Sequence, residues 1–106
     1  MTAPHRTLTL RPGERQELRL PTLSAAGYTW TWQLQGDAEA VEVVQGRPPA
    51  EELAGRPFGT SADTLFTLAG VRPGRARLHL AHRRVWERDK PPLEQRSYDI
   101  TVQPTP

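Results

Sequence analysis

The sequence predicts an all-β domain of about seven to eight short strands packed as two facing sheets. Apolar residues recur with period two along most of the chain, and this period places alternate side chains on opposite faces of a strand. The 106 residues include 11 prolines, about twice the usual share of ~5%. Proline removes a backbone donor and ends helices, so this number argues against a helical bundle. Turn signals separate the periodic runs, which is typical of a sandwich or a barrel.

The first half of the chain predicts four strands. Leucines alternate with threonines in residues 7–10 and with charged residues in residues 17–20. Between these runs, residues 11–14 read Arg-Pro-Gly-Glu, a composition that favours a turn. The clearest strand follows, and we expect its large residues to share one face, with both tryptophans in the core: Tyr28, Trp30, Trp32 and Leu34. After a Gly-Asp turn, residues 40–45 predict a short fourth strand.

The second half predicts three more strands. Phe66 and Leu68 share a face, and a second Pro-Gly turn follows at residues 71–74. Small or apolar residues then alternate with arginine and histidine in residues 75–80, and the last strand alternates apolar residues in residues 98–102. We therefore expect a single domain over residues 1–106, with an ordered core of about residues 6–103.

Three segments interrupt the strand pattern: residues 20–27, 46–61 and 84–93. A loop as long as the second one is uncommon in a compact domain and is more often functional than not. In a Greek-key sandwich the loops gather at the two ends of the sheets, so three prominent loops can form one binding edge. The alternative is that they only connect strands.

Residue types that carry catalysis or bind metals are scarce. The chain has no cysteine, which excludes disulfides, thiolate catalysis and cysteine-bound zinc. His79 and His82 are three positions apart on a predicted strand, so they point to opposite faces, and we interpret them as exposed and half-buried strand residues. No serine lies in a G-x-S-x-G elbow and no Walker lysine is present. We expect no enzyme activity, no metal and no cofactor.

The charge distribution points to a soluble protein without a nucleic-acid partner. The 14 basic and 12 acidic residues give a net charge of +2 and are interspersed, apart from a modest cluster at Arg83, Arg84 and Arg88. No apolar run approaches the roughly 18 residues of a transmembrane helix, and the N-terminus lacks the layout of a signal peptide. We expect a monomer in the cytoplasm, or in the periplasm or medium if a leader has been removed.

Three motifs resemble the chagasin family of inhibitors of papain-like cysteine proteases. Residues 26–30, Ala-Gly-Tyr-Thr-Trp, are similar to its Thr-Gly-Tyr-x-Trp stretch, and residues 66–81 are similar to its strand-turn-strand segment. Residues 84–92, Arg-Val-Trp-Glu-Arg-Asp-Lys-Pro-Pro, resemble its R-P-W-E-x-x-x-x-P loop. The order and spacing agree over about residues 6–103, and Trp-Glu followed by prolines is the most specific element.

The resemblance implies an immunoglobulin-like sandwich with Greek-key connections, and a reversible inhibitor whose three loops wedge into the protease cleft. The first loop would enter the cleft and the other two would embrace its sides, without covalent chemistry. Trp86 would lay a flat ring against the protease, while Arg84 would pair with a carboxylate or pack on Trp86. The residues expected to touch the protease are Leu23, Ser24, Ala25, Ala26, Gly27, Tyr28, Pro57, Phe58, Gly59, Arg84, Val85 and Trp86.

The chain departs from the family motifs at the loop tips. Residues 23–26 read Leu-Ser-Ala-Ala where the family has N-P-T-T, so both threonine hydroxyls are missing. The glycine-rich motif of the second loop is degenerate, and Val85 replaces a proline in the third. Two other functions therefore stay open: a non-inhibitory immunoglobulin-like interaction module, and a sugar-binding sandwich with Trp86 as a stacking platform.

Overall fold

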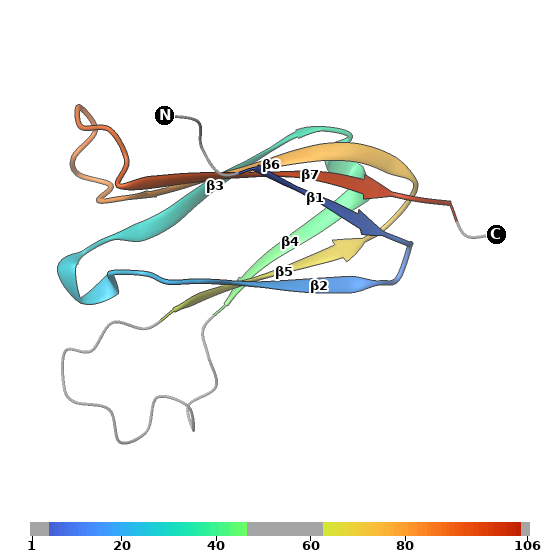
Figure 1. Cartoon of the computed structure of the whole chain (residues 1–106), viewed down its shortest axis with the longest axis horizontal. Helices are drawn as coiled ribbons and strands as arrows, with labels where there is room; N and C mark the ends of the chain where they lie inside the picture. The colour runs from blue at the N-terminus through green and yellow to red at the C-terminus, as the bar shows by residue number, and fades with distance from the viewer. Residues whose placement is uncertain (1–4, 47–62, 105–106) are drawn as a thin grey trace, which may run out of the picture.

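The structure is a computed structural model that describes residues 5–46 and 63–104 (Figure 1). Two 3₁₀ turns, η1 and η2, accompany seven strands in these residues. None of the helices in these two ranges is long and apolar enough to cross a membrane. In chain order the elements are β1 His5–Leu10, β2 Arg15–Leu20, η1 Ser24–Ala26, β3 Thr29–Gly36, η2 Ala38–Ala40, β4 Val41–Gly46, β5 Thr64–Gly70, β6 Gly74–Arg83 and β7 Glu94–Val102.

The strands form two sheets that face each other (Figure 1). One sheet has the order β1-β7-β6-β3 and the other has the order β2-β5-β4. Strand β1 runs parallel to β7, whereas all other neighbours are antiparallel. The chain changes sheet after β1, β2, β3 and β5, which is the Greek-key connectivity of an immunoglobulin-like sandwich. The predicted fold class is therefore confirmed, with seven strands in the described ranges.

The core lies between the two sheets and follows the predicted period of two. Alternate residues of β5, β6 and β7 are buried, because each strand presents one row of side chains to the opposite sheet. The largest fully buried side chains come from both sheets: Trp30, Phe66, Leu20, Leu68, Leu78, Leu80, Ile100 and Val102.

The prediction for the two strand tryptophans is half right. Trp30 is 2% exposed and belongs to the core, whereas Trp32 is 38% exposed. Strand β3 is the last strand of its sheet, so its side chains need cover from the edge of the other sheet. Near Trp32 that cover is incomplete, because Trp32 lines an open groove with Val41 and Val43 of β4.

The strand pairings bring several connections to one end of the sandwich. Thr29 at the start of β3 pairs with Arg83 at the end of β6, and Leu20 at the end of β2 pairs with Thr64 at the start of β5. The first loop (residues 21–28) and the third loop (residues 84–93) therefore lie at the same end (Figure 1). The end of β4 and the start of β5, which flank residues 47–62, lie there as well.

Candidate functional site

The first loop folds back on itself around one carbonyl group. The oxygen of Leu23 accepts hydrogen bonds from the backbone nitrogens of Ala26 at 3.0 Å and Tyr28 at 3.1 Å. Gly27 completes the return with a φ of +89°, a value that glycine adopts without the steric cost that a Cβ brings. Leu23 and Ala25 are exposed on this narrow tip.

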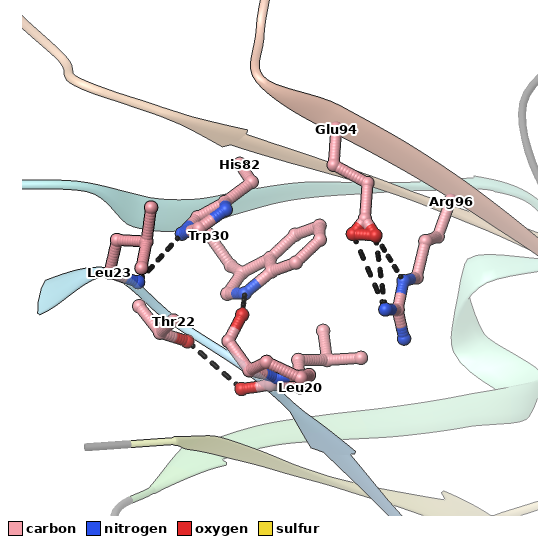
Figure 2. A network of polar contacts seen from close by, with 8 residues as sticks. Leu20, Thr22, Leu23, Trp30, His82, Glu94 and Arg96 are labelled. Atoms are coloured by element: carbon pink, nitrogen blue, oxygen red, sulfur yellow. Dashed lines mark hydrogen bonds and ion pairs between the residues drawn. The ribbon is translucent and has the colours of Figure 1, made fainter. Parts of the chain in front are cut away.

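Contacts beneath the tip tie the first loop to both sheets (Figure 2). The indole nitrogen of Trp30 donates to the carbonyl of Pro21 at 3.3 Å. The hydroxyl of Thr22 is buried, donates to the carbonyl of Leu20 at 3.0 Å, and lies 2.8 Å from the hydroxyl of Thr64. Since buried polar groups stabilise a structure only when they are paired, these contacts hold the loop in a single position.

The third loop consists of successive turns that its own backbone closes. The nitrogen of Glu87 donates to the carbonyl of Arg84 at 3.0 Å, and the nitrogen of Lys90 donates to the carbonyl of Glu87 at 3.2 Å. The Lys90 ammonium donates to the Glu87 carboxylate at 2.9 Å. This hydrogen bond is the main cause that lowers the pKa of Glu87 below its ordinary value. The carboxylate is therefore charged at neutral pH, and its role is to stabilise the loop rather than to transfer protons.

Arg84 connects the third loop to the first. Its Nε donates to the carbonyl oxygen of Ala26 at 2.8 Å. Its guanidinium carbon lies 4.6 Å from the centre of the Tyr28 ring, a cation–π distance. One of its terminal nitrogens is 3.7 Å from the carboxylate of Glu87. Within the chain, Arg84 thus pairs with the Glu87 carboxylate, and its guanidinium packs on the Tyr28 ring.

Among the residues that the structure describes, Trp86 is the most exposed large aromatic residue. Its side chain is 66% exposed, although its ring lies directly over Gly27. A Cβ added at Gly27 would lie 2.4 Å from Cη2 of that ring, so only glycine leaves room for it. Leu23 of the first loop and Val85 of the third loop are exposed as well. The first and third loops therefore expose one indole and two aliphatic side chains at the same end of the sandwich, and exposed apolar groups of this kind are typical of a partner surface.

The structure brings together the predicted residues of the first and third loops, from Leu23 to Tyr28 and from Arg84 to Trp86. The predicted contacts Pro57, Phe58 and Gly59 lie outside the described residues. Within the described ranges, no group of three or more histidine, aspartate and glutamate side chains could hold a metal ion.

Sequence reasoning missed the burial of His82. His79 is partly buried and lies 3.2 Å from the Ser97 hydroxyl, close to the expected environment. His82 is only 4% exposed, which corrects the interpretation of an exposed or half-buried residue. The period of two that runs through Leu78 and Leu80 continues to position 82 and would have predicted its burial.

The comparison with protein families shows to which family the chain belongs. The family described as "Chagasin family peptidase inhibitor I42" matches residues 9–102. The chain belongs to the chagasin family. As a chagasin-family protein it is an inhibitor of cysteine proteases and not an enzyme. No curated protein matches the sequence.

Three solved structures share the fold of this chagasin-family chain at low sequence identity. The cysteine protease inhibitor EhICP2 from Entamoeba histolytica superposes with a TM-score of 0.71 at 19% identity, covering 94% of this chain and 88% of that one. Amebosin gives 0.65 at 20% identity, covering 96% and 100%. PbICP-C, solved in complex with falcipain-2, gives 0.68 at 15% identity, covering 98% and 90%.

Proposed function

We propose that this protein reversibly inhibits papain-like cysteine proteases by inserting a loop wedge, defined as residues 23–28 and 84–86, into the active-site cleft. The observation that carries the proposal is the direct contact between these two segments: Arg84 donates to the Ala26 carbonyl at 2.8 Å, and the Trp86 ring covers Gly27. One similar structure, PbICP-C, holds a bound protease, falcipain-2.

The loop wedge has the physical properties of a tight binder. Its backbone turns and its anchors to Trp30 and Thr22 order it before binding, which lowers the entropy cost of association. Tryptophan and arginine dominate interface hot spots, and here Arg84 supports the wedge while Trp86 presents its ring to the partner. The tip residues Ala25 and Ala26 are small, so the wedge can enter a narrow cleft with its backbone.

The missing threonine hydroxyls do not remove this mechanism. With alanine at positions 25 and 26, the tip relies on shape and backbone contacts in the cleft, and more of the affinity depends on the third loop. Residues 57–59 would contact the opposite side of the cleft, as the family motif implies.

Titration of papain activity with the wild-type protein and with Trp86→Ala tests the proposal. Truncating a hot-spot tryptophan costs about 2 kcal/mol or more, so the inhibition constant should rise by roughly 30-fold or more. Trp32→Ala is the matched control, because it removes the same side chain from an exposed position in the middle of β3.

Thermal melts of both variants serve as the control that each is folded at the assay temperature. Equal inhibition by the Trp86→Ala and Trp32→Ala variants would contradict the loop wedge. Absence of inhibition by the wild-type protein against papain and related enzymes would contradict the proposed target class.

A further inference from the structure

The imidazole of His82 contacts the first loop at Leu23 (Figure 2). Its Nε2 lies 3.3 Å from the backbone nitrogen of Leu23 and accepts that N–H. The ring stacks on the indole of Trp30, with centroids 4.6 Å apart and planes inclined by 9°. The imidazole also meets the Tyr28 ring in a tilted arrangement, with centroids 5.3 Å apart. One buried side chain thus contacts Leu23 at the tip of the first loop, Tyr28 at its end, and Trp30, which anchors it.

This hydrogen bond requires one protonation state. A backbone N–H is always a donor, so Nε2 must offer a lone pair, and the imidazole is then neutral with its proton on Nδ1. A protonated ring would direct an N–H at the Leu23 N–H and lose the bond. Of the two ring forms, only the neutral one fits the observed loop.

The charged groups around His82 do little to favour the protonated form. Glu94 of β7 pairs with His82 in the register, but its carboxylate accepts hydrogen bonds from Arg96 at 3.0 and 3.2 Å. Arg96 itself faces the Trp30 ring at 5.5 Å, and Arg84 lies over the Tyr28 ring. Burial, opposed by Glu94 and assisted by Arg96, lowers the pKa of His82.

We propose that neutral His82 is a positioning residue for the first loop, and that protonation of His82 releases Leu23 and weakens inhibition at acidic pH. The inference deepens the proposed function and rests on it. It assigns this inhibitor a working range near neutral pH, and weaker binding in an acidic compartment.

The sign of the effect follows from the direction of the pKa shift. Because the folded pKa lies below the ordinary value of about 6.5, the unfolded chain binds the proton more readily than the folded one. The stabilisation is therefore fully present above about pH 6.5 and is lost as the pH falls from there through the folded pKa.

Two variants separate the hydrogen bond from the stacking. His82→Gln keeps an acceptor near the position of Nε2 but does not titrate, and His82→Phe keeps a ring against Trp30 but accepts no hydrogen bond. Inhibition constants against papain are measured between about pH 5 and pH 8, the range in which histidine titrates. At each pH the wild-type value is divided by the His82→Gln value, which cancels the titration of the protease itself.

The ratio of the wild-type inhibition constant to the His82→Gln inhibition constant should rise by about three- to tenfold on acidification. This factor corresponds to the loss of one hydrogen bond. The His82→Phe inhibition constant should be raised by a similar factor at neutral pH, and its ratio to the His82→Gln value should not change with pH. A ratio that stays flat while the ¹⁵N shifts of the His82 ring show that it becomes protonated would overturn the proposal.

Measurements on the unmodified protein without protease give a second, independent test. The ¹⁵N shifts of the His82 ring should show a proton on Nδ1 at neutral pH. The protection factor of the Leu23 amide, which compares its exchange rate with that of an unstructured amide at the same pH, should fall as His82 becomes protonated. A proton on Nε2 at neutral pH would overturn the positioning role. If the protein inhibits no papain-like protease at any pH, the proposed function fails, and the Leu23 exchange alone decides whether His82 positions the loop.

Discussion

Substitution of Gly27 by alanine tests how closely the two loops depend on each other. Gly27 has a φ of +89°, and an alanine in the left-handed region costs about 1–2 kcal/mol. The new Cβ would also lie 2.4 Å from Cη2 of Trp86, so the ring would have to move by about 1 Å to reach an ordinary contact of 3.4 Å. The substitution therefore strains the first loop and displaces the exposed indole at the same time.

The matched control is Gly13→Ala at the opposite end of the molecule. Gly13 has a nearly identical φ of +91°, but a Cβ there meets no atom within 4 Å. Both variants should lose about 1–2 kcal/mol in urea unfolding, which lowers the Tm by roughly 5–10 °C in a domain of this size. Gly27→Ala alone should weaken inhibition of papain, by about tenfold or more, or ~1.4 kcal/mol.

The comparison of the two variants separates stability from function. If Gly13→Ala weakens inhibition as much as Gly27→Ala, the loss reflects general destabilisation, and the contact between Trp86 and Gly27 has no part in binding. If neither variant affects inhibition, the loop wedge as described is refuted.

Two further predictions concern Arg84 and the strand tryptophans. Arg84→Ala removes the hydrogen bond to the Ala26 carbonyl; the loss of about 1 kcal/mol for one hydrogen bond should lower the Tm by roughly 5 °C and, because the loop wedge loses this support, should weaken inhibition by about fivefold. An unchanged inhibition constant would argue against Arg84 as a support of the wedge. Trp30→Ala should cost about 3–5 kcal/mol in urea unfolding and Trp32→Ala only about 1 kcal/mol, because the two side chains are 2% and 38% exposed; equal losses would contradict their assignment to core and edge.

Most of the fold could be predicted because each strand carries its own signal. The alternation in residues 75–80 and 98–102 predicts a buried face whatever the neighbouring strands are, and the Pro-Gly turns mark where the chain reverses. Strand order is different, since it depends on pairing between distant segments. The exposure of Trp32 follows from the place of β3 at the edge of its sheet, which a local pattern does not contain.

The candidate site was predictable as a set of loops but not as a set of contacts. The motif around Trp86 indicated the third loop, and the exposed indole agrees with an aromatic side chain that has no core to join. The stacking of Arg84 on Tyr28 and the hydrogen bond from Leu23 to His82 join residues about 60 positions apart in the chain. Such contacts exist only once the strands have paired, so sequence spacing does not reveal them.

The central claim is that the loop wedge occupies the protease cleft. Calorimetric titration of this protein into papain, with the cleft either open or filled by a covalent peptidyl inhibitor, tests it most directly. The account predicts tight binding to open papain and none to filled papain. Equal binding to both forms would show that the partner surface lies outside the cleft and would contradict the wedge.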